Sequence, residues 1–302
     1  MKIAIIIINF DGAEDTLECL DSILECNKKS LELIKIYLVD NSIKKPLSKE
    51  ELTSGLNIEY IRSEENTGFA EGNNIGIRRA IDDEADIVAL INNDTKFIDN
   101  SLLETINYFS ANDDIGIIGL VNFYYSKPDV VWQAGFNIDK HTLHRDSIRS
   151  YREDVDFIPC DYVPGSSIII KSSVFREIGL LDKNYFAYFE EADFCLQAKN
   201  KGFKVGFNPK STILHKVGIS SDSLIKLYLR TRNFLYLSNK YLSKLRFRFQ
   251  ELKFLLRLIL KILIKEDKKF KKLNVVYISV RDFYNGNMYS GSLPRIIELI
   301  NK

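Results

Sequence analysis

The stretch "VALINNDTKFID", residues 88–99, combines the two features that decide how this chain folds. It begins inside an apolar run, Ile87–Ile91, of the kind that forms a strand buried on both faces of a parallel sheet. Two amides, a carboxylate and a hydroxyl follow at once, as Asn92 to Thr95. These polar residues either cap the next helix or form a binding site. Because Asp99 and Asn100 are better placed to cap that helix, the pattern favours a site.

Strand and helix patterns alternate over the first 120 residues. Lys2–Ile8 is dominated by β-branched residues, and Ala13–Glu25 has apolar residues at a helical period. Further strands are predicted at 33–39, 58–61, 87–91 and 115–121, and further helices near 70–81 and 101–109. This alternation predicts an α/β fold with a doubly wound, mostly parallel central sheet flanked by helices.

Polar clusters follow three of the predicted strands. They are Asn9-Phe10-Asp11, Asp40-Asn41-Ser42 and Asn92-Asn93-Asp94. Ligands of open α/β sheets bind outside the carboxyl ends of the strands, so the three clusters predict one shared crevice. The first turn, "NFDGAED", has neither GxGxxG nor GxxxxGK[ST], which argues against a dinucleotide fold and a P-loop. The phosphates of a nucleotide would then need another counter-charge, and carboxylate and amide oxygens suit Mg²⁺ or Mn²⁺.

The segment "ENTGFAEGNNIGI", residues 65–77, carries glycines at positions 68, 72 and 76. At a spacing of four they lie on one helix face, where they either let a neighbouring backbone pack closely or accompany a ligand site. Asn66, Asn73 and Asn74 beside them are suited to contacting a ligand.

Composition narrows the class of protein. With 302 residues, 45% of them hydrophobic and 27% charged, the chain has room for one large domain, or a main domain with an appendage. The 42 basic and 41 acidic residues nearly cancel, which gives no support for a nucleic-acid binder. Four cysteines without a CxxC pair indicate a reduced, cytosolic chain. No apolar run approaches the roughly 18 residues of a membrane span, and Ile3–Ile8 is too short for a signal peptide.

The region after about Leu224 is predicted to be helical and basic. Between Lys240 and Lys272 there are 12 Lys or Arg residues against 3 acids. Lys253, Arg257, Lys261 and Lys265 recur every four residues among Leu, Ile and Phe. Two interpretations stay open: a solvated face on a helix packed against the rest of the protein, or an interfacial helix whose cations meet anionic lipid.

Five motifs occur in a fixed order: "VDNSI", "NTGFAEGNNIGI", "LINNDT", the segment from "PGSSIIIK" to "GFNP" at 164–209, and "ILHKVG". Together they resemble the family 2 glycosyltransferases, in particular the rhamnosyltransferase-like branch that builds bacterial surface polysaccharides. The resemblance covers roughly residues 1–235. It implies a GT-A fold and inverting transfer of a sugar from a nucleotide-diphosphate donor, with dTDP-rhamnose as the first expectation, to a saccharide or lipid-linked acceptor. It also implies work at the cytoplasmic face of a membrane, where a peripheral, lipid-binding C-terminal helix has a purpose.

The resemblance also implies roles on the donor side of the site. Asp40 matches the family residue that contacts the nucleotide base, with Asn9 nearby. Asn92-Asn93-Asp94 takes the place of the family's DxD, which makes Asp94 a direct ligand of Mn²⁺ or Mg²⁺. His215 matches a histidine that often completes the metal site. Asn66, Gly68 and Asn73 join the expected nucleotide-sugar contacts.

On the acceptor side, the resemblance makes Glu191 the catalytic base. The family's Glu-Asp-x-Asp is here Glu190-Glu191-Ala192-Asp193, and a Glu in place of Asp reaches one methylene further. Glu190 therefore stays a rival for the role.

The predicted organisation is a catalytic domain at 1–223, with a nucleotide-binding half at 1–125 and an acceptor half at 126–223. A helical region at 224–302 follows, with possible membrane association. Two other functions fit parts of the pattern. A sugar-nucleotide nucleotidyltransferase would need a Gly-rich basic loop where "NFDGAED" is acidic. A catalytically inactive sugar-nucleotide-binding module would fit the weakened DxD, but Asp94 and Glu191 are retained. The pattern indicates no oligomeric state.

Overall fold

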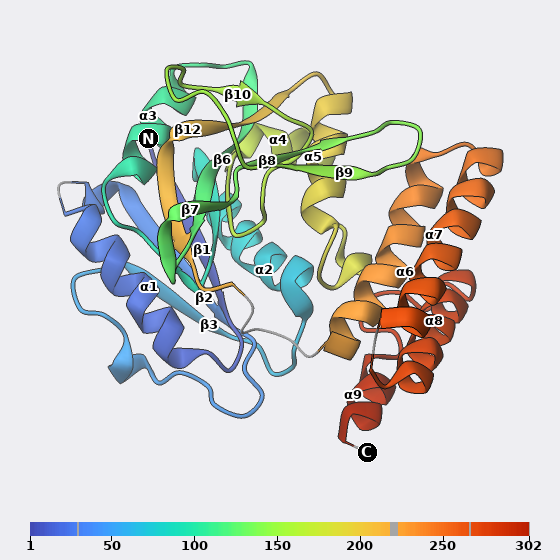
Figure 1. The fold of residues 1–302 in the computed structure, drawn as a ribbon. Coiled ribbons are helices and arrows are strands. Elements are labelled where there is room, and N and C mark those ends of the chain that lie inside the picture. The colour runs from blue at the N-terminus through green and yellow to red at the C-terminus, as the bar shows by residue number, and fades with distance from the viewer. Residues whose placement is uncertain (29, 218–222, 266, 302) are drawn as a thin grey trace. The chain divides into compact units, whose positions relative to one another are not determined.

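The computed structural model describes residues 1–28, 30–217, 223–265 and 267–301, apart from the side chain of Lys265 (Figure 1). Lys265 of the basic repeat and Gly218 of "ILHKVG" thus fall outside the described side chains and residues, respectively. In the described part, ten strands form one sheet in the order β10-β12-β6-β11-β4-β1-β2-β3, with β5 on β12 and β7 on β6. Their bounds are β1 Ile3–Asn9, β2 Ile34–Asp40, β3 Ile58–Arg62, β4 Ile87–Asn92, β5 Thr95–Lys96, β6 Ile115–Tyr124, β7 Lys127–Gln133, β10 Ile158–Pro159, β11 Ser167–Lys171 and β12 Lys204–His215.

The sheet is mixed, with a parallel majority. Strand β1 pairs in parallel with β2 and β4, β2 with β3, and β6 with β12. Strand β11 runs antiparallel between β4 and β6. The apolar runs of β1 and β4 are buried on both faces, as strands in the middle of a covered sheet require. The predicted α/β fold is therefore confirmed.

Helices cover the two faces of this sheet. They are α1 Ala13–Cys26, α2 Gly68–Asp82, α3 Ser101–Ser110, α4 Ser172–Ile178 and α5 Glu190–Asn200, with short 3₁₀ turns at Leu31–Leu33, Lys49–Glu51 and Lys183–Tyr185. Apolar residues of α1 and α3 share one core with Ile3, Ile5 and Ile7 of β1.

Helix α2 lies on the opposite side of β1. A Cβ built on Gly76 would sit 2.6 Å from Cγ2 of Ile6, and one on Gly72 would sit 3.0 Å from Cδ1 of Ile8. A side chain at Gly76 would collide with Ile6, and one at Gly72 would force the ends of the Asn41 and Ile8 side chains to move. Close packing is thus the correct interpretation for these two glycines.

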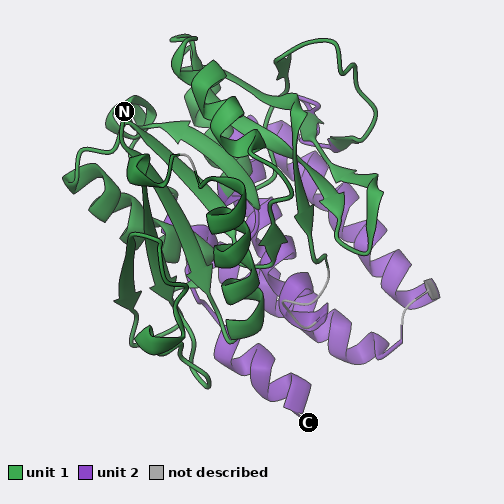
Figure 2. Cartoon of the chain, turned by 90° about the vertical axis from the view of Figure 1, so that its left-hand side faces the viewer, with its two compact units in different colours: residues 1–137, 146–181, 191–217 green, residues 138–145, 182–190, 218–302 purple. Residues whose placement is uncertain are grey.

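The chain forms two compact units (Figure 2). The first comprises residues 1–137, 146–181 and 191–217, and the second comprises 138–145, 182–190 and 218–302. Two short segments inside the predicted catalytic domain, 138–145 and 182–190, thus belong to the helical unit. A two-stranded sheet, β8 Gly135–Ile138 with β9 Arg145–Ile148, flanks the first of them.

The second unit is built from α6 Ser223–Tyr241, α7 Lys244–Lys265, α8 Lys269–Tyr284 and α9 Leu293–Asn301. Helix α6 packs against α7, α8 and α9, and α7 packs against α8. Their core holds Tyr228 and Leu229 from α6, Val275 and Ile278 from α8, and Ile296 from α9. Across the described ranges, we find no helix with both the length and the apolar character that a membrane crossing needs.

Candidate active site

The three polar clusters meet at one edge of the sheet. Asn9 and Asp40 are register partners at the ends of β1 and β2, and Asn92 pairs with Ile8 of β1. Asn9 donates hydrogen bonds from Nδ2 to Oδ1 of Asp40 at 3.0 Å and to Oγ of Ser42 at 2.9 Å. The shared edge predicted from the strand ends is present in the fold.

Asp40 is fully buried, and its carboxylate accepts four hydrogen bonds. The donors are Asn9 Nδ2, the backbone N–H groups of Ser42 and Leu47, and the Tyr60 hydroxyl. Burial by itself raises the pKa of Asp40, but the hydrogen bonds from Ser42, Tyr60 and Leu47 outweigh it and hold this pKa below its ordinary value. The carboxylate is therefore ionised and fixes the turn from Asp40 to Leu47.

Thr16 on α1 links the first cluster to the third. Its hydroxyl lies 2.9 Å from Oδ1 of Asn9 and accepts a hydrogen bond of 3.0 Å from Nδ2 of Asn93. Gly12 leaves room for this contact, because a Cβ there would lie 2.9 Å from Nδ2 of Asn93. No pattern in the sequence singles out Thr16, since a threonine in the first turn of a helix is common.

Asp94 and His215 lie side by side. The Nε2 atom of His215 is 3.1 Å from Oδ1 of Asp94, although the two residues are 121 positions apart. Pairing of β12 with β5 sets His215 opposite Thr95, and the Trp132 ring meets the His215 ring edge-on with centroids 4.5 Å apart. Both residues are buried, at 8% exposure for Asp94 and 6% for His215. The fold thus brings together the two residues expected to bind a metal.

The donor atoms of this pair fit a divalent cation. Nδ1 of His215 and Oδ1 of Asn92 are buried and have no hydrogen-bond partner within the described residues. Buried polar atoms are rarely left unpaired in proteins, and such atoms often mark an ion or a bound ligand. Asp94 Oδ1 and His215 Nε2, 3.1 Å apart, are the two atoms of this pair that one divalent cation could bind together. The described residues contain no cluster of three or more His, Cys, Asp or Glu side chains arranged for a metal.

Lys216 anchors the end of β12 that carries His215. Its Nζ lies 2.6 Å from carboxylate oxygens of both Asp15 and Glu18 on α1, and its backbone N–H donates to the Asp94 carbonyl. The hydrogen bond from Lys216 is the main reason that the pKa of Glu18 falls to about 2; burial opposes it, and Tyr125 and Lys96 add to it. Because these partners are some 200 positions apart, the sequence alone could not pair them.

Glu191 lies near the same sheet edge. A Cβ built on Gly165 would be 3.5 Å from Cβ of Glu191 and 3.6 Å from Cε1 of Phe69. The next residue, Ser166, accepts a hydrogen bond of 3.0 Å at its carbonyl from the backbone N–H of Asn92. The half-buried Glu191 therefore adjoins residues that border the Asn92-Asn93-Asp94 turn and the start of α2.

Glu190 and Glu191 are the first two residues of α5, and the chain before them is strained. Phe186, Tyr188 and Phe189 have φ angles of 65°, 72° and 79°. Bulky aromatic residues rarely adopt this left-handed region, and each such residue costs on the order of 1–3 kcal/mol. Strain of this kind persists only where surrounding contacts enforce it.

Two neighbouring side chains of α6 supply these contacts. Asn233 donates from Nδ2 to the carbonyls of Tyr185, Ala187 and Tyr188 at 2.8, 2.8 and 2.9 Å. The fully buried guanidinium of Arg232 donates to the carbonyls of Tyr185 at 3.1 Å and Asn184 at 3.3 Å. Sequence reasoning missed both residues, because polar residues in a helix are normally read as its solvated face.

The remaining predicted contacts occupy the start of α2. Oδ1 of Asn66 accepts a hydrogen bond from the Gly68 N–H, and Gly68 has a φ of 77° that favours glycine. Asn41 donates to the Gly68 carbonyl, which joins this turn to the Asp40 cluster. Asn73 is almost fully buried and donates to the Phe69 carbonyl, and Asn74 exchanges hydrogen bonds with the Leu181 backbone.

Comparison with known proteins decides the family. The model of Glycosyl transferase family 2 matches residues 4–179, more than half of the chain. The chain belongs to this family. It is therefore a glycosyltransferase with the GT-A fold, as the resemblance in its motifs implied.

Two relatives and one solved structure give the level of similarity. The low-salt glycan biosynthesis hexosyltransferase Agl10 of Haloferax volcanii is 26% identical over 253 residues, covering 80% of this chain and 77% of the relative. The dTDP-rhamnosyl transferase RfbF of Shigella flexneri is 24% identical over 215 residues, covering 68% and 71%. The mannosyltransferase PcManGT of Pyrobaculum calidifontis, solved with GDP-Man and Mn²⁺, aligns with a TM-score of 0.54 at 14% identity over 99% of this chain and 78% of that one.

Proposed function

We propose that this glycosyltransferase moves a sugar, with inversion, from a nucleotide-diphosphate donor to a saccharide or lipid-linked acceptor in the synthesis of a surface polysaccharide. The observation that carries the proposal is the buried Asp94–His215 contact at the edge that also holds Asn9 and Asp40. Rhamnose from dTDP-rhamnose is the first donor to test, supported by the similarity to a dTDP-rhamnosyl transferase.

Asp94 and His215 would hold Mn²⁺ or Mg²⁺, with Asn92 Oδ1 as a further oxygen donor. The cation, when bound, neutralises the charge that develops on the leaving diphosphate. Asp40, Asn9 and Asn66 border the place of the nucleotide. Because both oxygens of Asp40 are bonded within the protein, we expect it to act on the base mainly through the turn that it fixes.

Glu191 is the proposed base for the acceptor hydroxyl. It is half-buried and belongs to the same unit as Asp94, whereas Glu190 is only 4% exposed and belongs to the second unit. In the transfer, the acceptor oxygen forms a bond to the anomeric carbon and its proton passes to the Glu191 carboxylate. The bond from that carbon to the diphosphate breaks, and the electron pair leaves with the diphosphate. One displacement inverts the configuration.

We further propose that α7 attaches the enzyme to the inner face of an anionic membrane. An apolar stripe on α7 is 45–83% exposed and consists of Leu245, Phe249, Leu252, Leu256, Leu260 and Leu263. A cation row of Lys253, Arg257 and Lys261 runs beside it on the same helix. An apolar face bordered by lysines and arginines is the composition of interfacial helices, whose cations reach lipid headgroups.

Sedimentation with vesicles tests this attachment on the full chain. We expect the wild type to pellet with phosphatidylglycerol vesicles, and the double variant Leu252→Glu/Leu256→Glu to stay in the supernatant with an unchanged melting temperature. Equal pelleting of the two proteins would contradict the membrane proposal.

The transfer activity is tested by a panel of nucleotide sugars. We expect at least one of dTDP-rhamnose, UDP- and GDP-sugars to raise the melting temperature in the presence of Mn²⁺ and to be hydrolysed slowly without acceptor. A panel in which Mn²⁺ and nucleotide sugars neither stabilise the protein nor react would refute the proposed function.

A further inference from the structure

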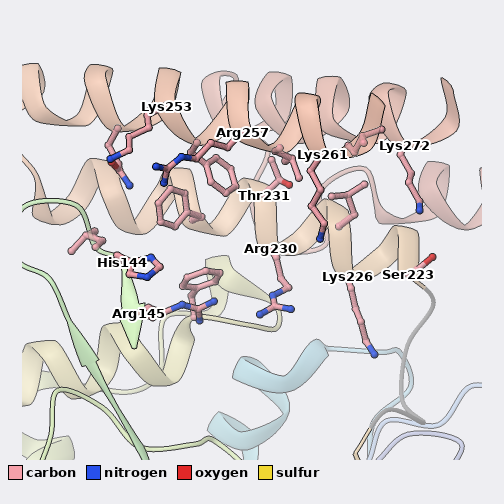
Figure 3. Close-up of a pocket in the computed structure, with 18 residues that line it drawn as sticks. His144, Arg145, Ser223, Lys226, Arg230, Thr231, Lys253, Arg257, Lys261 and Lys272 are labelled. Atoms are coloured by element: carbon pink, nitrogen blue, oxygen red, sulfur yellow. The ribbon is translucent and has the colours of Figure 1, made fainter. Parts of the chain in front are cut away.

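The second unit contains a pocket of about 530 Å³ that plays no part in the site described above. Residues of α6, α7, α8 and the segments 138–145 and 182–190 line it. Seven lining residues are cationic: Arg145, Lys226, Arg230, Lys253, Arg257, Lys261 and Lys272. None of the residues described as lining it is an Asp or Glu. Figure 3 shows cationic side chains from α6 and α7 around a group of aromatic rings.

The wall between these cations is aromatic. Phe189, Phe234 and Phe254 form a row, with ring centroids 6.2 Å apart for the first pair and 4.4 Å apart for the second. The Arg145 guanidinium lies over the Phe189 ring at 4.3 Å. A free inorganic anion has no apolar part that could pack against these rings. Cations around an apolar wall instead fit a ligand with both an anionic and an apolar part.

We propose that this pocket binds a phosphate- or diphosphate-bearing amphiphile, namely the lipid that carries the acceptor saccharide. This inference rests on the proposed function, since it names the acceptor class of that reaction. Seven cationic side chains around one pocket favour a ligand that carries negative charge. Arg145, Arg230 and Arg257 can each meet two phosphate oxygens with a planar fork of donors.

The pocket adjoins the proposed membrane face through α7. Successive residues of a helix are turned by about 100°, so each row of residues spaced by four has one neighbouring row on either side. The cation row is followed, one residue later, by the pocket-lining residues Phe254, Leu258 and Ile262. It is preceded, one residue earlier, by the exposed residues Leu252, Leu256 and Leu260. A chain that leaves the pocket across the cation row therefore reaches the apolar stripe.

The pocket is also tied to the proposed base by the chain itself. Phe189, which forms one end of the aromatic row, directly precedes Glu190 and Glu191. Asn233 and Arg232 donate hydrogen bonds to the backbone just before Phe189 and so fix its position. Phe189 of the pocket wall is thus only two residues from Glu191 along the chain.

Calorimetry with three probes separates the possible ligands of the full-length enzyme. Dodecyl phosphate, below its micellar concentration, is expected to bind at least tenfold more tightly than dodecyl maltoside, which has the same tail without the charge. The affinity for dodecyl phosphate should also be at least tenfold higher than the affinity for inorganic phosphate. Equal affinity for inorganic phosphate would mean a simple anion site, and equal affinity for the maltoside would mean a simple apolar site; either result overturns the inference.

Two charge reversals on α7 provide the matched comparison. Arg257→Glu should weaken dodecyl phosphate binding at least tenfold, whereas Arg246→Glu should leave it unchanged, because Arg246 is exposed and does not line the pocket. Both variants should keep the wild-type melting temperature and the Mn²⁺-dependent binding of the donor. If Arg257→Glu binds dodecyl phosphate normally, the pocket assignment is wrong.

Two further outcomes have separate meanings. If Arg257→Glu lowers binding to phosphatidylglycerol vesicles but leaves the affinity for dodecyl phosphate unchanged, Arg257 serves only the membrane face and the pocket assignment is wrong. If dodecyl phosphate binds as expected but no nucleotide sugar does, the proposed function fails while the pocket stands as a lipid-phosphate site.

Discussion

Replacing Asn233 with alanine tests whether the strained segment before Glu190 positions the base. The Asn233 amide has two N–H groups and reaches three carbonyls, so one N–H is shared. A hydrogen bond of this kind contributes about 1 kcal/mol net, and the variant therefore loses about 2–3 kcal/mol. The three residues at positive φ, which the amide holds in place, are then free to relax.

The expected consequence is a loss of turnover. Each 1.36 kcal/mol corresponds to a tenfold change in rate. If the lost ~2–3 kcal/mol adds in full to the activation free energy, kcat falls by about 30- to 160-fold. The Kd of the donor should stay within about twofold, because the donor residues lie in the first unit. Asn233→Asp should lose at least as much, since a carboxylate would face three carbonyl oxygens.

The assay combines kcat, donor Kd by calorimetry and melting temperature. Asn200→Ala is the matched control, because Asn200 is an exposed asparagine near the end of α5. If Asn233→Ala keeps kcat within twofold of the wild type, Asn233 does not position the base. The same conclusion follows if kcat and donor affinity fall equally, since the effect would then be general and not specific to the base.

Two other predictions follow from the same site. Glu191→Gln should lower kcat by at least ~100-fold at unchanged donor Kd, while Glu190→Gln stays active; the reverse pattern would assign the base to Glu190. Glu18→Gln should lower the free energy of unfolding at pH 7. The folded protein lowers the pKa of Glu18 from 4.5 to about 2, so ionised Glu18 stabilises the fold at any pH above the unfolded-state pKa of 4.5. This difference between variant and wild type should shrink as the pH falls from about 4.5 toward 2, and a constant difference in urea melts at pH 7, 5 and 3.5 would contradict it.

Sequence patterns predicted the sheet because its central strands are continuous apolar runs. The apolar runs of β1 and β4 allow only a strand covered on both faces, and the polar residues after them mark a single edge because parallel strands end together. The register of Asn9 with Asp40 follows from that rule. The Gly72 and Gly76 contacts with β1 agree with one of the two interpretations of the glycine spacing.

Long-range contacts were beyond sequence patterns. Asp94 and His215 were paired only through the family resemblance, since no periodicity relates residues 121 positions apart. The hold of Asn233 on the Tyr185–Tyr188 backbone could not be foreseen, because aromatic residues rarely adopt positive φ and nothing local signals that they do. Contacts of this kind group residues 182–190 with the helical unit, whereas the sequence analysis predicted them within the catalytic domain.

Asp94 and His215 are proposed to hold a cation that binds the donor's diphosphate. Calorimetric titration of dTDP, UDP and GDP into the wild type and Asp94→Ala, each with and without Mn²⁺, tests it most directly. We predict that Mn²⁺ strengthens the binding of at least one nucleotide to the wild type by tenfold or more, and leaves its binding to Asp94→Ala unchanged. The same Mn²⁺ enhancement in both proteins would contradict the account.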